Sequence, residues 1–435
     1  MLGLVNPTPG TATVLPRLLD AAEDASPVDA VEAVTRELAT SLGAKSASLL
    51  ITDLTGRALA RLAHVPWGAL VAGRGTAMPR REGEEAAVVI PLDGGPPDQA
   101  LRSQAVQVLA PGSWNLAVSA ECWTVLAPVT ERGEALGLLE LALDGEPEAD
   151  VVEEIARTAH VLAFVVIANR RHTDLYEWAQ RRTPFSLSAE IQRRLLPPAF
   201  TCEGGSFTLS AWLEPAATIG GDTFDYSLGR DVLHLTVTDA MGHGLASALT
   251  ATLCVSSLRS SRRQGASLSE QARAANVALA EQAATAGIEG FVTGLLGTLD
   301  LRTGALEVIN AGHVGPYLAR DGRVRLLDLP AGPPMGAFLE STYDGTTVML
   351  HPGDRLVLVT DGMLERGAAS LDLPAELLRT RQLHAREATR GLADKVLDVV
   401  GPTLSDDATL LVLDWHGGHG RPRTTAAGAD RDGTT

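Results

Sequence analysis

The first third of the chain alternates helical and strand-like hydrophobic patterns. Between residues 28 and 42, apolar positions recur at helical spacing and predict an amphipathic helix. These positions are Val28, Val31, Val34, Leu38 and Leu42. Strand-like runs follow at 46–52 and 57–65, and a later pair at 122–128 and 135–143 is joined by a short charged turn. Antiparallel strands with flanking helices predict an α+β sensor domain over residues 27–147, after an N-terminal extension of residues 1–26.

A second helical pattern begins after Glu148. Its apolar positions alternate by three and four residues, which fits heptad spacing. They are Val152, Ile155, Ala159, Leu162 and Val166. Two interpretations stay open, because the pattern is short: a coiled coil that supports a homodimer, or the last helix of the preceding domain packed on its sheet. We predict a continuous helical linker over residues 148–186.

In the second half of the chain, strand patterns end on acidic residues. The apolar run 232–238 leads into Asp239, and 356–360 leads into Asp361. Such strands would deliver both carboxylates to a common sheet edge. Helical patterns occupy 187–196, 245–258 and 268–284, with a hairpin sequence at 300–304. The tail, residues 416–435, is rich in glycine, threonine and charge, and we expect it to be disordered.

Bulk properties narrow the class of protein. A net charge of −17 argues against a nucleic-acid partner, which would require a basic face. The most apolar stretch, 161–168, is too short to cross a bilayer, and residues 1–13 lack signal-peptide character, so we expect no membrane insertion. The cysteines Cys122, Cys202 and Cys254 are widely separated and indicate buried thiols in a reducing compartment. These features predict a cytoplasmic protein.

Four acidic motifs in the second half suggest a metal site. They contain Asp222, Asp239, Asp361 and Asp406; Asp222 and Asp361 stand directly beside glycine, and glycines follow Asp239 at 242 and 244. Carboxylate oxygens are preferred ligands of hard divalent cations such as Mg²⁺ and Mn²⁺. Any one motif alone is ordinary turn chemistry. The four together, in this order, favour a single metal site whose ligands come from separate segments of the chain.

In that order the motifs resemble those of metal-dependent protein phosphatases of the PP2C class, in the bacterial sporulation and stress-regulator branch. The resemblance spans roughly 188–415 and includes Gly-Gly-Asp at 220–222, Asp-Ala-Met-Gly-His-Gly at 239–244, Asn-Ala-Gly-His at 310–313 and Thr-Asp-Gly at 360–362. It implies a phosphatase domain over 187–415, built as a β-sandwich flanked by helices. Two cations about 3.5–4 Å apart would supply the nucleophile and neutralise the transferring phosphoryl group.

The resemblance also implies roles for particular residues. Asp222, Asp239, Asp361 and Asp406 would be catalytic metal ligands, together with the carbonyl of Ala240. Asp407 is the less favoured member of its pair and could contact an ion through water. The arginine that eukaryotic members place before the first acid is missing from 214–218. Backbone amides near Gly242 and Gly244 are an alternative anchor for the phosphate.

Three further residues have two open interpretations each. Asp225 either orients Asp222 or a water from behind the metal ligands, or is an ordinary turn acid. His243 and His313 are either general acids for the leaving group or structural residues, and the structural interpretation is favoured for both.

Residues 27–147 resemble a GAF domain, mainly through the closing hairpin at 124–129 and 136–141. Trp67, Trp114 and Trp123 either line a pocket for an unknown small-molecule or protein signal, or pack in the core. The combined resemblance implies a serine/threonine phosphatase, controlled by the GAF-like domain, that acts on a phosphorylated anti-sigma-factor antagonist. A phosphatase fold that binds without turnover, and a hydrolase of small phosphorylated metabolites, are the alternatives.

Overall fold

The fold is described from a computed structural model of the 435-residue chain. The structure describes residues 14–53, 56–66, 89–114, 120–180, 186–214, 221–286, 290–364, 372–401, 404, 406–420 and 428–430. The chain divides into two compact units. Unit 1 comprises residues 1–184 and 424–431, and unit 2 comprises residues 185–423 and 432–435.

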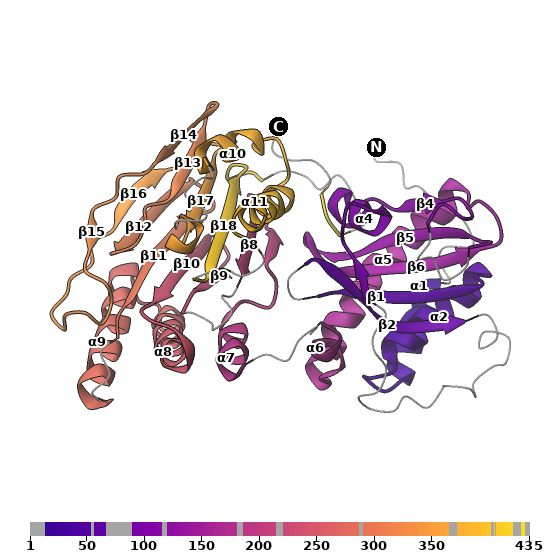
Figure 1. Cartoon of the computed structure of the whole chain (residues 1–435), viewed down its shortest axis with the longest axis horizontal. Helices are drawn as coiled ribbons and strands as arrows, with labels where there is room; N and C mark the ends of the chain where they lie inside the picture. Colours follow the sequence, from indigo (N-terminus) through magenta and orange to yellow (C-terminus); the bar gives the residue numbers. More distant parts are fainter. Residues whose placement is uncertain are drawn as a thin grey trace, which may run out of the picture. The chain divides into compact units, whose positions relative to one another are not determined.

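Unit 1 is built on one antiparallel sheet of six strands in the order β3-β2-β1-β6-β5-β4 (Figure 1). The strands are β1 (Ser46–Thr52), β2 (Ala58–Pro66), β3 (Val89–Pro91), β4 (Gln107–Leu109), β5 (Trp123–Glu131) and β6 (Glu134–Leu143). The two predicted strand pairs are therefore present. The first and last strands, β1 and β6, pair in the centre, with Leu49 opposite Leu139.

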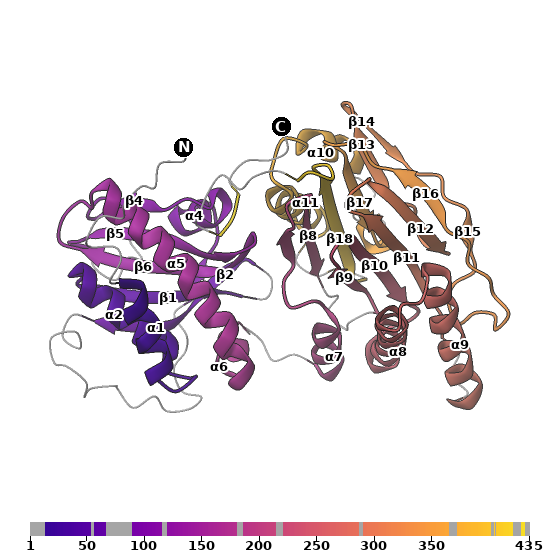
Figure 2. The same cartoon turned by 180° about the vertical axis from the view of Figure 1, so that it is seen from behind.

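Helices cover both faces of this sheet. On one face lie α1 (Val14–Asp24), α2 (Ala30–Leu42) and α5 (Ala149–Asn169), as Figure 2 shows. Val31, Val34 and Leu38 of α2 are buried against the sheet, so the predicted amphipathic helix is confirmed. The short helix α4 (Pro96–Ser103) packs on the other face, where Trp114 joins its apolar cluster. Trp114 and Trp123 both lie in apolar clusters, while Trp67 falls outside the described residues.

The helix after Glu148 packs on its own sheet. Ile155, Ala159 and Leu162 of α5 are buried in the same apolar cluster as β5 and β6. The heptad-like positions are thus used within unit 1, which removes the pattern's support for a helix-mediated dimer. The prediction of one continuous helix is wrong, because α5 gives way to a 3₁₀ turn at 170–172 and an extended Thr173 before α6 (Leu175–Gln180).

Part of the C-terminal tail belongs to unit 1, in contrast to the expected disorder. Residues 428–430 are buried, and the carbonyl of Gly428 accepts a hydrogen bond of 3.0 Å from the amide of Gly133. Gly428 has φ +91°, and a Cβ there would lie 2.1 Å from the carbonyl oxygen of Thr130. The segment fits because glycine has no side chain at this close approach.

Unit 2 is a sandwich of two sheets. One sheet has the order β15-β12-β11-β10-β9, with β16 also paired to β12, and the other has the order β14-β13-β17-β18-β8-β7. The strands are β7 (Thr201–Glu203), β8 (Phe207–Glu214), β9 (Thr223–Leu228), β10 (Val232–Ala240), β11 (Val292–Asp300), β12 (Ala305–Ala311), β13 (Tyr317–Arg320), β14 (Arg323–Leu326), β15 (Ala331–Gly332), β16 (Thr346–Met349), β17 (Arg355–Val359) and β18 (Ala408–Trp415). Their inner faces share one apolar cluster that includes Phe207, Phe224 and Trp415.

Helices cover the outer faces of the sandwich, as expected (Figures 1 and 2). They are α7 (Leu187–Leu195), α8 (Gly244–Arg263), α9 (Leu268–Ala286), α10 (Leu373–Arg379) and α11 (Ala385–Val400), with a 3₁₀ turn η3 (Asp361–Met363) after β17. The helices α8 and α9 pack on the β10–β12 face, and α10 and α11 pack on the β17–β18 face. The mixed α and β architecture of the C-terminal half is therefore confirmed.

The cysteines Cys122, Cys202 and Cys254 are all buried free thiols. In the part of the chain that the structure describes, no helix is both long and apolar enough to span a bilayer.

Candidate metal centre

Strand register brings the acidic motifs to one end of the sandwich. Asp222 directly precedes β9 and Asp239 lies near the end of β10, and these strands pair with Thr223 opposite Thr238. In the other sheet, Asp361 follows the end of β17, while Asp406 and Asp407 precede β18, with Val359 opposite Leu410. Each sheet therefore contributes acids at the same edge, because the strands involved run antiparallel.

The electrostatics of these acids reflect their proximity. Burial and, after it, the charges of Asp361, Asp406 and Asp407 together raise the pKa of Asp239 to about 7. Burial, followed by the charges of Asp239 and Asp407, also raises the pKa of Asp222 well above its usual range. Like charges gathered in a partly buried site disfavour the ionised forms unless a cation compensates them.

Asp222 is held by hydrogen bonds from the opposite sheet. Its Oδ2 accepts from the hydroxyls of Thr360 and Thr409, each at 2.7 Å. Thr360 immediately precedes Asp361, so one bond fixes the spacing of two motif acids. Asp222 is 2% exposed, and both hydroxyl bonds lower its pKa against the effect of burial.

Gln192 of α7 connects this helix to the acids. Its Nε2 donates 2.8 Å to the carbonyl of Asp222 and 2.7 Å to Oδ2 of Asp407. The amide is buried and joins the start of β9 to the start of β18. At its C-terminal end α7 is held again, because Arg259 Nη2 donates 2.5 Å to the carbonyl of Leu195.

Two motif glycines permit close backbone packing. A Cβ at Gly221 would lie 2.4 Å from the carbonyl oxygen of Ala240, and a Cβ at Gly362 would lie 1.9 Å from the carbonyl oxygen of Asp407. Neither contact leaves room for a side chain. The glycines beside these acids are therefore required by neighbouring strands of the protein, a requirement the sequence alone did not reveal.

The donors fit a hard divalent cation in chemical type. They are carboxylates and the Ala240 carbonyl, all oxygen, which Mg²⁺ and Mn²⁺ prefer. They do not form a closed ligand set, since no three His, Cys, Asp or Glu side chains among the described residues are arranged to hold an ion. Asp239 is half-buried and Asp406 is exposed, so the cluster opens to solvent on that side.

Asp225, the possible support for Asp222, faces α8 instead. Its carboxylate accepts from Arg259 Nη2 at 2.8 Å and lies 3.3 Å from Arg262 Nη1. This buried ion pair ties β9 to α8 and stabilises the strand that carries Asp222 at its start.

The two histidines differ in their surroundings. The ring of His313 is bonded through both nitrogens, with Nδ1 2.8 Å from the Thr293 hydroxyl and Nε2 3.2 Å from the Val359 carbonyl. Burial lowers the pKa of His313 to about 4, which leaves the ring neutral near pH 7. A neutral, doubly bonded imidazole is a structural link between the sheets. His243 is exposed at the N-terminus of α8 and makes no side-chain cap.

Sequence reasoning missed the residues that support the acids. Gln192, Thr360, Thr409 and Arg259 received no role, although Thr360 and Thr409 stand within the motifs. Polar residues that are buried beside acidic motifs could have identified the two threonines. Gln192 is separated from its partner Asp407 by 215 residues, so no local pattern indicates that pair. The segment 215–220, where the phosphate-clamping arginine is missing, lies outside the described residues.

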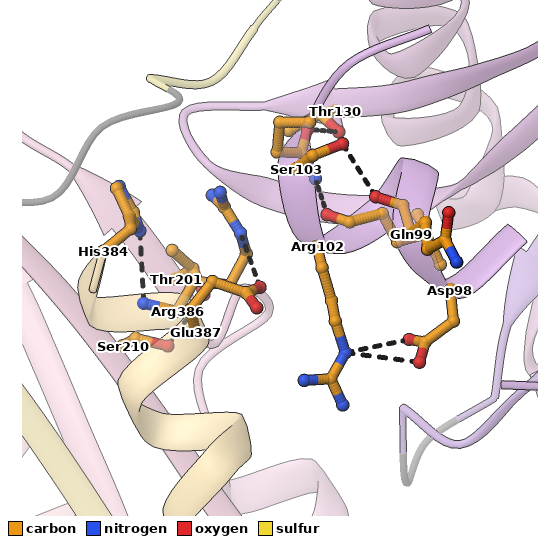
Figure 3. A network of polar contacts seen from close by, with 12 residues as sticks. Asp98, Gln99, Arg102, Ser103, Thr130, Thr201, Ser210, His384, Arg386 and Glu387 are labelled. Carbon is orange, nitrogen blue, oxygen red and sulfur yellow. Dashed lines mark hydrogen bonds and ion pairs between the residues drawn. The ribbon is translucent and has the colours of Figure 1, made fainter. Parts of the chain in front are cut away.

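A second buried polar network lies at the N-terminus of α11, where Figure 3 shows His384 and Arg386. His384 Nδ1 accepts from the amide of Arg386 at 3.2 Å, and its Nε2 lies 3.2 Å from Oε1 of Glu203. Burial lowers the pKa of His384. The histidine therefore acts as a helix cap.

Residues 229–416 match the family model described as Stage II sporulation protein E (SpoIIE). The match covers less than half of the chain and contains Asp239, Asp361 and Asp406. The prediction of a SpoIIE/PP2C-type phosphatase domain in the C-terminal part is confirmed at this level. The GAF resemblance of unit 1 stays a prediction.

Two characterised proteins are similar in sequence. Protein IcfG of Synechocystis is 22% identical over 260 residues, covering 52% of this chain and 40% of IcfG. Phosphoserine phosphatase RsbU of Bacillus subtilis is 23% identical over 272 residues, covering 61% of this chain and 80% of RsbU. The chain thus spans well under two thirds of IcfG and most of RsbU.

Solved structures of phosphatase domains are similar to the C-terminal part. The SiaA-PP2C domain of Pseudomonas aeruginosa is 23% identical. The match covers 52% of this chain and 94% of the SiaA-PP2C chain, with a TM-score of 0.45. The catalytic domain of the phosphatase PstP, in complex with two manganese ions, is 19% identical over 48% of this chain and 97% of its own, with a TM-score of 0.37. RsbX in complex with magnesium is 15% identical. The match covers 49% of this chain and 98% of the RsbX chain, with a TM-score of 0.39. PstP was thus solved with Mn²⁺ and RsbX with Mg²⁺.

Proposed function

We propose that this chain, with a SpoIIE/PP2C-type domain in its C-terminal half, is a metal-dependent protein serine/threonine phosphatase. The observation that carries the proposal is the gathering of the motif acids from both sheets. The pKa of Asp239 is raised first by burial and then by the charges of Asp361, Asp406 and Asp407, which come from the other sheet. A partly buried cluster of like charges is costly for folding unless it serves a cation. Phosphate hydrolysis is the activity in the name of one relative, the phosphoserine phosphatase RsbU.

The proposed ligands are Asp222, Asp239, Asp361 and Asp406, with the carbonyl of Ala240. When bound, two Mn²⁺ or Mg²⁺ ions would supply a strong nucleophile at neutral pH and positive charge on the transferring oxygens. The chain's own residues have positioning roles. Thr360 and Thr409 orient one oxygen of Asp222 and leave the other free, and Gln192 fixes Asp407 beside it.

The proposed substrate is phosphoserine or phosphothreonine on a regulatory protein, an anti-sigma-factor antagonist. The name of RsbU, a phosphoserine phosphatase, supports the phosphoserine part of this proposal. The sigma-factor pathway follows from the resemblance of the motifs.

Control by the GAF-like unit 1 would act through α7. This helix begins three residues after the boundary between the units and reaches the acids through Gln192. A shift of α7 would move the carbonyl of Asp222 and the carboxylate of Asp407 together. The contact supports a route by which events outside unit 2 could change the acid cluster.

The test is phosphate release from an aryl phosphate and from a phosphoserine peptide, with Mn²⁺, with Mg²⁺ and with a chelator. We expect metal-dependent turnover by the wild-type protein and background rates for Asp239→Asn. Turnover that persists in the chelator, or in the folded variant, would refute the two-metal proposal.

A binding module without turnover is the second candidate. The open arrangement of the acids, in which no three form a ligand set, favours it. Calorimetric titration with Mn²⁺ separates the two, because the phosphatase requires cation binding that Asp239→Asn weakens, whereas a non-catalytic module requires none.

A further inference from the structure

A groove lies between the edges of the two sheets of unit 2, at β14 and β16. It encloses about 500 Å³, and its lining includes Arg320, Arg325, Leu326, Asp328, Met349 and His351. None of these residues belongs to the acidic motifs. The groove is therefore separate from the candidate metal centre.

The floor of the groove is held by a buried ion pair. Arg320 Nε donates 2.8 Å to Oδ1 of Asp354, and its Nη2 donates 2.8 Å to the carbonyl of Met349. Asp354 is 2% exposed and also accepts 2.7 Å from the amide of His351. These bonds tie β13 of one sheet to the end of β16 in the other. The floor is thus preformed.

Positive charge remains on one wall after this pairing. Arg320 is opposite Arg323 in the β13–β14 hairpin, and Arg325 follows two residues later on the same face. Within the described part of the chain, neither Arg323 nor Arg325 has an ion-pair partner. Asp328 is the one acid that lines the groove, against the two arginines Arg320 and Arg325. The wall is locally basic in a chain whose net charge is −17.

The rim of the groove has the composition of a protein interface. Leu326 is 52% exposed and Met349 is 48% exposed, one on each strand that borders the groove. Exposed methionine and arginine around an apolar centre are enriched at protein contacts. Among the strands that the structure describes, β14 pairs only with β13, and β16 only with β12. Both therefore present unpaired backbone groups to an incoming chain.

We propose that this groove docks an acidic, extended segment of the protein substrate. The proposal rests on the proposed function and adds to it a recognition site remote from the chemistry. The carboxylates of the segment would pair with Arg325 and Arg323, and its backbone would lie along the open edge of β14.

The groove and the acids are at opposite ends of the sandwich. Ala319, next to Arg320, is opposite Arg355 at the start of β17, whereas Asp361 follows the end of that strand. Six residues of strand span about 20 Å. A substrate must therefore place its acidic segment at least about six extended residues from the phosphoserine. Docking at that distance lowers KM and leaves kcat unchanged.

The experiment uses two synthetic phosphoserine peptides with eight residues between the phosphoserine and a run of four residues. The run is four glutamates in one peptide and four serines in the other. With the full chain and Mn²⁺, we expect kcat/KM to favour the acidic peptide by about fivefold, the value of one exposed charge pair of about 1 kcal/mol. We expect Arg325→Glu to abolish this preference through KM.

Arg230→Glu is the matched control, since Arg230 is an exposed arginine in the turn before β10, at the edge of its sheet far from β16. It should keep the preference, and all three proteins should hydrolyse an aryl phosphate equally. Binding of the fluorescently labelled acidic peptide, measured by anisotropy, tests the groove even without turnover. Equal affinity of wild type and Arg325→Glu for that peptide would overturn the docking proposal. Absence of metal-dependent aryl phosphate turnover in the wild type would instead overturn the proposed function.

Discussion

Replacing Gln192 with methionine tests whether α7 positions the candidate metal ligands. Methionine keeps the length and volume of the side chain but removes both donated hydrogen bonds. A bond to a carboxylate contributes about 1.5–3 kcal/mol and a neutral one about 0.5–1.5 kcal/mol. The sum predicts a loss of about 2–4.5 kcal/mol in the free energy of unfolding, because both acceptors stay buried.

The stronger consequence concerns metal affinity. Without the amide, Asp407 and the strand that begins after Asp222 are no longer tied together. Removing residues that orient metal ligands costs about 10–100-fold in affinity. We therefore expect the Mn²⁺ concentration for half-maximal aryl phosphate turnover to rise by at least about tenfold in Gln192→Met.

Gln271→Met supplies the control for stability. Gln271 of α9 is also buried in unit 2, and its amide donates 2.8 Å to the carbonyl of Ala266 in the turn before that helix, a contact that involves none of the acids. Calorimetry should show a lower Tm for both variants, with a changed Mn²⁺ requirement only for Gln192→Met. If the two variants lose stability alike and keep the wild-type Mn²⁺ requirement, Gln192 has no positioning role.

Three further predictions follow from close contacts and buried groups. Gly362→Ala should lower Tm and Mn²⁺-dependent turnover, because the new Cβ meets the Asp407 carbonyl at 1.9 Å, whereas Gly391→Ala, in open space within α11, should stabilise by up to about 1 kcal/mol. Burial lowers the pKa of His384, so its contribution to stability is present above its ordinary pKa of about 6.5 and is lost as pH falls below it. His384→Asn, which retains a capping side chain, should flatten the decrease of the free energy of unfolding between pH 7.5 and 5.5 by up to about 1.4 kcal/mol per pH unit, and an unchanged slope would contradict this. Gly428→Ala should release the tail segment from unit 1, seen as faster hydrogen exchange at the tip of the β5–β6 turn, and wild-type protection there would count against the docked tail.

The sequence by itself determined the elements and the chemistry of the motifs. Hydrophobic periodicity located α2, β1, β10 and β17 to within about two residues, because apolar spacing reflects which face of an element is buried. The same patterns indicated that acids follow strand ends, and acids next to glycine suggested a cation site. Local chemistry was sufficient for these statements.

Only the tertiary structure decided which residues support those acids and what the helix after Glu148 does. Heptad spacing is equally compatible with a coiled coil and with packing on a sheet, and the apolar surface of β5 and β6 resolved it in favour of the sheet. The bonds from Gln192 to Asp407 and from Thr360 to Asp222 join residues 215 and 138 positions apart. The docked segment at Gly428 likewise depends on a surface formed by the β5–β6 turn. Contacts between distant segments depend on how strands are ordered in a sheet and how sheets face each other, which local sequence does not encode.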